Sequence, residues 1–240
     1  MAKSGTLLGV VGAGALLCLA GCQRSATFEA EAALRPGAVY TGPAVATFHI
    51  PVDRLTIGQI ARELTAMADA NRAFAGVTSL HPTSTQTDQL HAVDRTHARR
   101  LGEIMDVIGW PTERVVGAEA SAAAFQIAKA SSDDPEFQRR CLSLMHDRLA
   151  SRQVDPERVA LLTDRVRIQA GQGQWYGTHV RVHRNEHGTL IATETAPIDD
   201  PASLDKRRDE LGLDPWRHYC RKVADTAARA SMPTLGGKPR

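Results

Sequence analysis

Apolar residues recur at helical spacing over much of the chain. Behind the capping box "TIGQ" at 56–59, which is typical of a helix start, one face carries Ile57, Ile60, Ala61, Leu64, Met67 and Ala68. A second apolar stripe runs from Leu90 to Ile108 and ends at Gly109-Trp110-Pro111, because proline cannot continue a helix. Residues 76–88 are rich in Ser, Thr, His and Pro, so we expect a loop between the two helices.

Four Asp-Pro steps predict further helix starts, because aspartate suits the N-cap and proline the first helical position. They are Asp134-Pro135, Asp155-Pro156, Asp200-Pro201 and Asp214-Pro215. Between the second and third steps the apolar period changes to two. The segments "RVRIQ" (165–169), "QWYGTHVRVHR" (174–184) and "TLIATE" (189–194) therefore predict three short strands.

Together these patterns predict a mainly α (α+β) fold. We expect a single, mostly helical domain over residues 47–232, with a small antiparallel β-meander near its C-terminal third. The composition agrees, since 42% of the residues are hydrophobic and only 5% are aromatic, which favours closely packed helices. Folded structure is expected to begin near Phe48.

The N-terminus carries an uncharged apolar run from Leu7 to Gly21, preceded only by the charge of Lys3. This run is short for a spanning helix, which needs about 20 apolar residues. "LAGC" at 19–22 resembles the lipobox of bacterial lipoproteins. The resemblance implies that residues 1–21 are a signal peptide, that Cys22 is acylated, with palmitate among its chains, and that the protein is anchored in the cell envelope. An ordinary cleaved signal and an uncleaved anchor are the alternatives.

The residue after the acylated cysteine indicates which membrane would hold the protein. Gln23 stands where an inner-membrane retention signal has Asp, so the resemblance implies the outer membrane if the host has two. Residues 22–46 contain Pro and Gly and show no sustained period, so we expect a flexible tether. Residues 233–240 are expected to form a basic tail.

The charge balance gives no sign of a nucleic-acid partner. The chain has 29 Lys and Arg against 27 Asp and Glu, and this balance predicts no basic patch or stripe. Cys141 and Cys220 remain after the signal and the lipidated residue. They are either bridged or two buried free thiols, and the sequence leaves both open.

Five segments between residues 94 and 215 resemble an uncharacterised bacterial family known only as a domain of unknown function. They are "DRTHARRLGEIMDVIGWPT", "VVGAEASAAAFQIA", "DPEFQRRCLSLM", "LLTDRVRIQAGQGQWYGT" and "IDDPASLDKRRDELGLDP". The resemblance covers roughly residues 88–220 and implies a shared fold without a known reaction. The chain departs from the pattern at His179, where Gln is expected, and at Ala128-Lys129, where Gln-His is expected.

The main polar cluster that the sequence predicts is Asp164, Arg165, Gln174, Tyr176, Thr178 and His179. Asp164 and Arg165 are expected to end a helix where the meander begins, beside the strand that carries Tyr176. In a period-two strand Tyr176 and Thr178 point inward, and Trp175, Gly177, His179, Arg181 and His183 share the outer face. The cluster would be either an acid–base site or a structural hydrogen-bond network, and we favour the network.

Other candidate chemistry is weaker. His179, His183 and His187 lack ligand spacing, and no CxxC or HExxH pattern is present, so we predict no metal site and no cofactor. Asp200, in the pair Asp199-Asp200, is explained as a helix cap. "DKRRDE" at 205–210 is expected to be the solvated face of a short helix. The alternative is that Arg207 or Arg208 clamps a carboxylate or phosphate.

The function that these patterns favour is a membrane-anchored binding or interaction module for a protein or a small envelope ligand. The expected binding face carries Trp175, Arg181 and His183. The alternative is a hydrolase or transferase that acts on an envelope component through Asp164, Tyr176 and His179.

Overall fold

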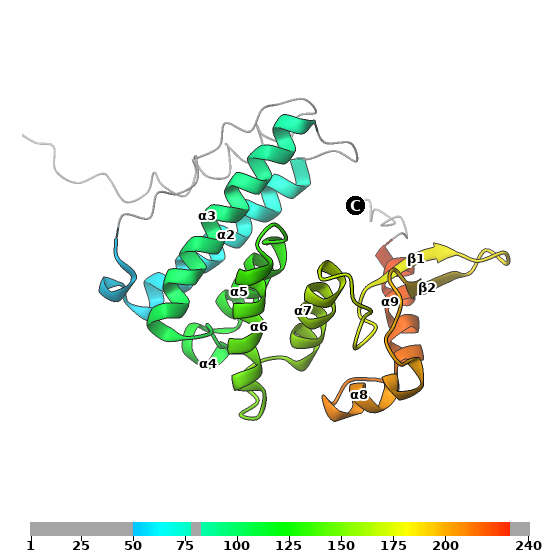
Figure 1. Cartoon of the computed structure of the whole chain (residues 1–240). Helices are drawn as coiled ribbons and strands as arrows, with labels where there is room; N and C mark the ends of the chain where they lie inside the picture. The colour runs from blue at the N-terminus through cyan, green and yellow to red at the C-terminus, as the bar shows by residue number, and fades with distance from the viewer. Residues whose placement is uncertain (1–49, 78–82, 231–240) are drawn as a thin grey trace, which may run out of the picture.

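The computed structural model describes residues 50–77 and 83–230 (Figure 1). The predicted signal peptide, the lipidated Cys22, the tether, the expected start at Phe48 and the basic tail lie outside these residues. None of the described helices is long and apolar enough to cross a membrane.

The predicted fold class is confirmed, since the described chain is mostly helical and carries a small antiparallel sheet near its C-terminal third. The helices and strands, in chain order, are η1 (Val52–Arg54), α2 (Ile57–Val77), α3 (Ser84–Ile108), α4 (Glu113–Val116), α5 (Ala118–Ala130), α6 (Pro135–Leu149), α7 (Pro156–Gln169), β1 (Val180–Arg184), β2 (Leu190–Glu194), η2 (Pro201–Ser203), α8 (Leu204–Glu210) and α9 (Trp216–Ala230).

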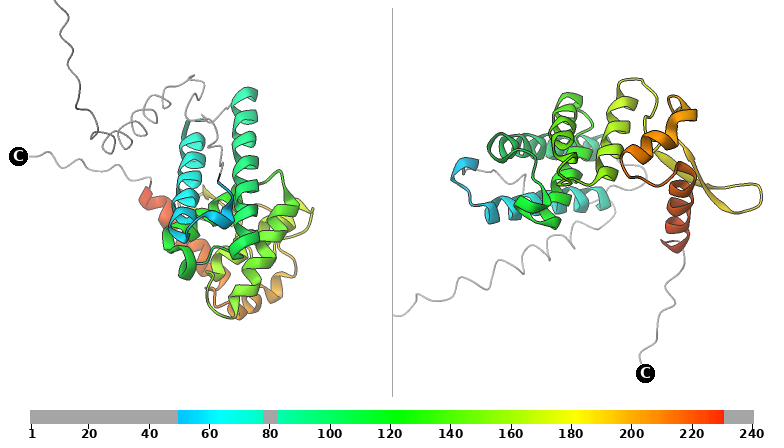
Figure 2. Two further views of the ribbon diagram at one scale, coloured as in Figure 1. Left: turned by 90° about the vertical axis from the view of Figure 1, so that its left-hand side faces the viewer. Right: turned by 90° about the horizontal axis from the view of Figure 1, so that it is seen from below.

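The hydrophobic core lies among α2, α3, α5, α6 and α7, with α2 and α3 side by side (Figures 1 and 2). Its centre is formed by fully buried side chains, one from each helix: Leu64, Leu101, Ile127, Met145 and Leu162. The alanine-rich α5 lets its neighbours approach closely. Cys141 and Cys220 are both buried free thiols, so the structure contains no bridge between them.

Several helix starts follow the sequence prediction. The Thr56 amide donates to Gln59 Oε1 at 2.8 Å and the Gln59 amide to Thr56 Oγ1 at 3.3 Å, which confirms the capping box. Asp134 caps α6 through the Phe137 amide, and Asp155 caps α7 through the Glu157 amide.

Other boundaries differ from the prediction. Part of the loop expected at 76–88 is helical, because α2 extends to Val77 and a second capping box, Thr83 with Gln86, starts α3. Asp200 is not a side-chain cap; it has a positive φ of 42° and makes no capping bond. At the start of α9, the Trp216 amide donates to Asp205 at 2.7 Å rather than to Asp214.

The three-stranded meander is reduced to a hairpin. Residues 165–169 are the last turns of α7, because Val166 continues the apolar stripe that packs on the core. Residues 174–179 form a loop with one parallel bridge, from Gln174 to Ile198. The remaining strands, β1 and β2, pair antiparallel with Val182 opposite Ala192, and α9 packs against them (Figure 1).

Candidate functional site

Asp164 of α7 holds the loop that carries the "WYGT" motif. Its side chain is fully buried, and Oδ1 accepts the backbone amides of Trp175 at 2.6 Å and Tyr176 at 2.8 Å. Oδ2 accepts both the amide of Thr178 at 2.8 Å and its hydroxyl at 2.7 Å. Four hydrogen bonds to one buried carboxylate fix this loop against α7.

The carbonyl groups of the same loop are satisfied by side chains of α8 and α9. Four consecutive carbonyls each accept one donor: Trp175 from Arg207 Nε at 2.9 Å, Tyr176 from Arg208 Nη1 at 2.6 Å, Gly177 from Trp216 Nε1 at 2.9 Å and Thr178 from the Tyr219 hydroxyl at 2.9 Å. A buried loop outside a sheet needs such partners for its backbone. Two of the five resemblance segments, those at 161–178 and 198–215, therefore come together with the start of α9 in one structural network.

Gly177 has a positive φ of 65° and lies against the indole of Trp216. A Cβ at this position would stand 2.6 Å from Trp216 Nε1, closer than atoms pack. Both the backbone conformation and the close approach therefore require glycine here.

The predicted polar cluster is only partly assembled. Asp164, Tyr176 and Thr178 meet, and Tyr176 and Thr178 point inward as predicted, with 8% and 4% of their surfaces exposed. Burial raises the pKa of the Tyr176 hydroxyl above its ordinary value. Arg165 turns instead toward the α5–α6 connection, where it donates to Ser132 Oγ at 2.5 Å.

His179 and Gln174 lie beside this cluster with contacts of their own. The Gln174 side chain accepts from the His179 amide at 2.7 Å and donates to its carbonyl at 3.1 Å. The His179 ring contacts the Leu161 carbonyl through Nε2 at 3.2 Å. The catalytic role of these residues stays a prediction, while their hydrogen bonds hold the loop in place.

The prediction that Arg207 and Arg208 belong to a solvated helix face is wrong. They are 7% and 2% exposed, because their guanidinium groups are directed at backbone carbonyls. Arg207 also donates to the carbonyls of Asp199 at 2.6 Å and Asp200 at 3.1 Å, and Arg208 to that of Asp214 at 2.6 Å. These bonds use the donors that the predicted anion clamp would need.

The expected binding face does not form one strand face. Trp175 is 37% exposed in the loop, stacked between the guanidinium groups of Arg167 and Arg207. Arg181 is exposed and His183 half-buried on β1. Across the described part of the chain, no group of three or more His, Cys, Asp or Glu is arranged to hold a metal ion.

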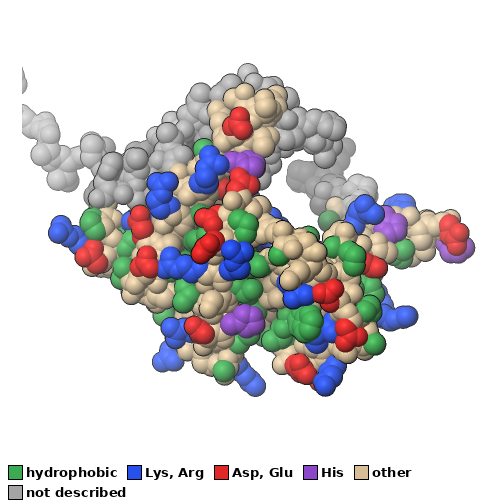
Figure 3. Space-filling model, viewed as in Figure 1, with side chains coloured by type: hydrophobic (Ala, Val, Ile, Leu, Met, Phe, Trp, Pro, Cys, Tyr) green, Lys and Arg blue, Asp and Glu red, His purple; other side chains and the backbone are tan. Residues whose placement is uncertain are grey.

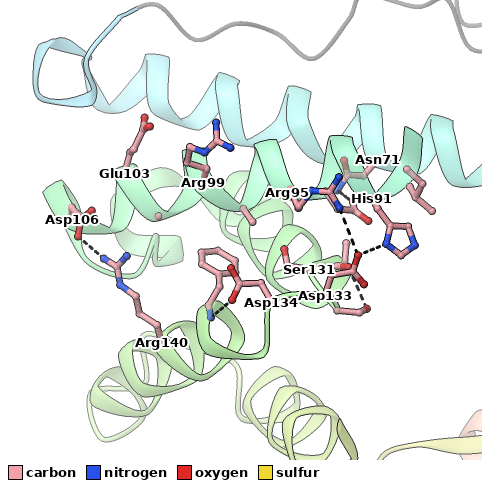
Figure 4. A pocket seen from close by; sticks show the side chains of 17 residues that line it. Asn71, His91, Arg95, Arg99, Glu103, Asp106, Ser131, Asp133, Asp134 and Arg140 are labelled. Atoms are coloured by element: carbon pink, nitrogen blue, oxygen red, sulfur yellow. Dashed lines mark hydrogen bonds and ion pairs between the residues drawn. The ribbon is translucent and has the colours of Figure 1, made fainter. Parts of the chain in front are cut away.

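A groove of about 710 Å³ lies between α3 and the connection from α5 to α6 (Figure 4). One wall is the face of α3 from Leu90 to Asp106, and the other runs from Ala130 to Arg140. Acidic and basic side chains gather together over α3 on this side of the molecule (Figure 3). Sequence reasoning missed the groove; the signal was a row of charged residues beside small ones, Ala98 and Gly102, on α3.

One end of the groove contains a chain of polar groups that begins inside the protein. The His97 ring lies 2.5 Å from Asn71 Oδ1 through Nδ1, and Asn71 Nδ2 donates to Asp94 Oδ1 at 3.0 Å. Since an amide oxygen only accepts, we assign the proton to His97 Nδ1. Burial lowers the pKa of His97 to about 4, so this ring is neutral at pH 7.

Asp94, which lines the groove, has an unusual carboxyl group. Burial raises its pKa from 3.8 to about 6, an effect that His91 opposes and Asp133 reinforces. Asp133 itself contacts the His91 ring and lies 3.9 Å from Arg95 (Figure 4). Among the described residues no lysine or arginine pairs with Asp94.

The other end of the groove is closed by an ion pair between Arg140 of α6 and Asp106 of α3 (Figure 4). Both side chains are largely exposed, at 43% and 67%. Between the two ends, Ala98 and Gly102 of α3 face Phe137 of α6. The groove thus has polar ends and an apolar floor between them, and Arg99 and Glu103 of α3 also line it.

A family model matches residues 58–230, which is most of the chain. The chain belongs to DUF6624, a family of unknown function. The expected membership of an uncharacterised family is confirmed. No curated protein and no solved structure matches the chain.

The DUF6624 match includes both features described above. The loop at 175–178 with its partners in α7, α8 and α9 lies inside it, and so do both walls of the groove. Cys22 and the rest of the N-terminal segment lie outside the match.

Proposed function

We propose that this protein is a lipid-anchored envelope protein whose DUF6624 domain binds a ligand in the groove between α3 and the α5–α6 connection. The anchor rests on the "LAGC" segment at 19–22 and on an apolar run too short to span a membrane. Acyl chains on Cys22 would hold the domain at the membrane surface, since each buried methylene contributes about 0.8 kcal/mol.

The groove itself carries the binding proposal. Its volume of about 710 Å³ is that of small-molecule sites, which are concave, mostly apolar and lined by a few polar groups. Asp94 adds a carboxyl group with a pKa displaced to about 6, and such groups concentrate at functional sites. The groove and this carboxyl group lie on the same helix face.

The alternative, a hydrolase or transferase that uses Asp164, Tyr176 and His179, receives less support from the geometry. Each oxygen of Asp164 already accepts two hydrogen bonds from the loop that it holds. A carboxylate in this position has no lone pair directed toward a substrate. A binding role therefore explains the arrangement with fewer additional assumptions.

The anchor is tested by Cys22→Ala in the native host. The variant is expected to lose metabolic labelling with a fatty-acid probe and to leave the membrane fraction, which is the outer-membrane fraction if the host has two membranes. Membrane retention without a label would contradict lipid anchoring and support an uncleaved spanning segment instead.

The groove is tested by filling it. A Cβ on Gly102 would meet Arg140 and Phe137 at 3.6 and 3.8 Å, an ordinary contact distance, so Gly102→Ala is accommodated while Gly102→Leu would extend across the groove. The wild type is screened by thermal shift against cell-wall fragments, lipids, nucleotides and divalent metals. A ligand at 100 times its Kd adds about 2.7 kcal/mol of stability.

The expected outcome is a shift that Gly102→Ala keeps and Gly102→Leu loses. A shift of equal size in the Leu variant would place the ligand elsewhere and contradict the groove as the binding site.

A further inference from the structure

We infer that the groove takes a short peptide with free ends, about three or four residues long, whose ammonium group lies by Asp94 and whose carboxylate lies by Arg140. This inference rests on the proposed function, since it specifies the ligand of the same groove.

The Asp94 end is built for a cation. The carboxyl group accepts one hydrogen bond, from Asn71, and among the described residues it forms no ion pair with a lysine or arginine, although the charge of His91 acts on it. The neighbouring Asp133 adds negative charge, although His91 and Arg95 partly neutralise it. An ammonium group has three donors and one positive charge, so it would supply the missing partner of Asp94.

The Arg140 end is built for a carboxylate. Its guanidinium lies over the groove floor, because Nη1 would be 3.6 Å from a Cβ on Gly102. The bond to Asp106 uses Nη2 and is exposed, and exposed ion pairs contribute little stability. The remaining donors of the planar fork suit a carboxylate, which arginine binds in bidentate geometry.

The spacing between the two ends sets the length of the ligand. Asp94 and Gly102 are eight residues apart on α3, which corresponds to about 12 Å at the helical rise of about 1.5 Å per residue. An extended chain covers about 3.3–3.6 Å per residue, so three or four residues span this distance. The small floor residues Ala98 and Gly102 leave room for a backbone, and Phe137 offers an apolar contact.

Ligands of a single charge fit this groove less well. A small anion such as phosphate would bind at Arg140 alone and leave Asp94 without a partner, and a simple amine would leave the donors of Arg140 unused. The opposite charges at the two ends therefore select a ligand that carries both.

The experiment measures binding of trialanine and tetraalanine to the full-length protein in detergent micelles, by calorimetry and by Tm. The matched probes are the same peptides acetylated at the amino end or amidated at the carboxyl end. The variants are Asp94→Asn and Arg140→Gln, with the exposed neighbours Asp88→Asn and Arg139→Gln as controls that keep the same chemistry on the same helices.

We expect the free peptides to bind and to raise Tm, and either blocked end to weaken binding at least tenfold. Asp94→Asn should remove the preference for a free amino end, and Arg140→Gln the preference for a free carboxyl end. Asp106→Asn, which releases Arg140, should bind as well as the wild type or more tightly. The control variants should bind like the wild type.

Two results would overturn the inference. Equal binding of free and blocked peptides would show that the charged ends are not recognised. Failure of all these peptides, while another member of the broader panel shifts the wild type but not Gly102→Leu, would reject the peptide and leave the groove as a binding site. If nothing shifts the wild type, the proposed groove function fails as well.

Discussion

The backbone amide of Tyr176 donates a 2.8 Å hydrogen bond to the buried carboxylate of Asp164, 12 residues earlier in the chain. The same carboxylate also accepts the backbone amides of Trp175 and Thr178. Four side chains of α8 and α9 donate hydrogen bonds to the carbonyls of the same loop. The segments at 161–178 and 198–215 are thus explained first by folding. The groove beside α3 is a separate feature, where we place ligand binding.

Asp164→Asn should destabilise the protein strongly. An amide in place of the carboxylate would direct its NH2 group at the donors of the loop and leave at least one backbone amide, that of Thr178 or those of Trp175 and Tyr176, without an acceptor. We expect a loss of about 3 kcal/mol in the free energy of unfolding, measured by urea denaturation. The exposed Asp209→Asn on α8 is the matched control and should unfold like the wild type. An unchanged stability, together with loss of a hydrolytic or transferase activity, would instead support the catalytic alternative.

Arg208→Lys should also destabilise, although it preserves the charge. Lysine cannot reproduce the fork that bonds the carbonyls of Tyr176 and Asp214, both at 2.6 Å. We expect a loss of about 2 kcal/mol, read from the denaturation midpoint, while Arg221→Lys on the exposed face of α9 changes little. Equal midpoints for the two variants would mean that Arg208 does not support the loop.

Asp94→Asn should stabilise the folded protein at neutral pH. The pKa of Asp94 is raised from 3.8 to about 6 in the folded state, so folding favours its protonated form. The stability that protonated Asp94 contributes to the folded state is fully present below pH 3.8 and is lost as the pH rises through 6. Asparagine resembles the protonated form, and the variant should exceed the wild type by about 1 kcal/mol above pH 7, after allowance for solvent screening.

The measurement for Asp94 is the difference in unfolding free energy between variant and wild type from pH 4 to 8. The pKa of His97 lies at about 4, and its titration changes the unfolding free energy of both proteins alike, so this effect cancels in the difference. Asp88→Asn should show no such pH dependence. A constant difference for Asp94→Asn would contradict the raised pKa.

Gly102→Ala should stabilise the protein by about 0.5–1 kcal/mol, because alanine loses less backbone entropy in a helix than glycine does. The space is present, since the nearest atoms to a new Cβ are side-chain atoms 3.6 and 3.8 Å away.

Gly117→Ala should have the opposite effect on stability. No atom lies within 4 Å there, but its φ of 87° strains any larger residue, so this variant should be destabilised. Thermal unfolding of both variants gives the comparison, and a fall in Tm for Gly102→Ala would mean that the groove floor has no room.

Local patterns were sufficient to predict most of the helical framework. Thr56 with Gln59, Asp134 and Asp155 start helices where the sequence placed them, because capping depends on neighbours three residues away or fewer. The strand expected at 165–169 failed because five alternating residues also fit the end of an amphipathic helix.

The remaining differences depend on contacts between distant segments. Arg207 and Arg208 look solvent-exposed in a charged run, yet each also bonds a carbonyl of the loop that lies 32 positions earlier, at Trp175 and Tyr176. The groove likewise needs α3 and the segment 130–140 to be brought together, and no local pattern encodes that pairing.

Hydrogen–deuterium exchange in the presence of a ligand from the screen tests binding in the groove, because it shows which backbone amides the ligand protects. We expect slower exchange in residues 91–106 and 130–140, with no change at 175–184. Protection of 175–184, beside Trp175 and Arg181, with unchanged exchange along the groove, would contradict binding there and move the binding site to the loop and hairpin.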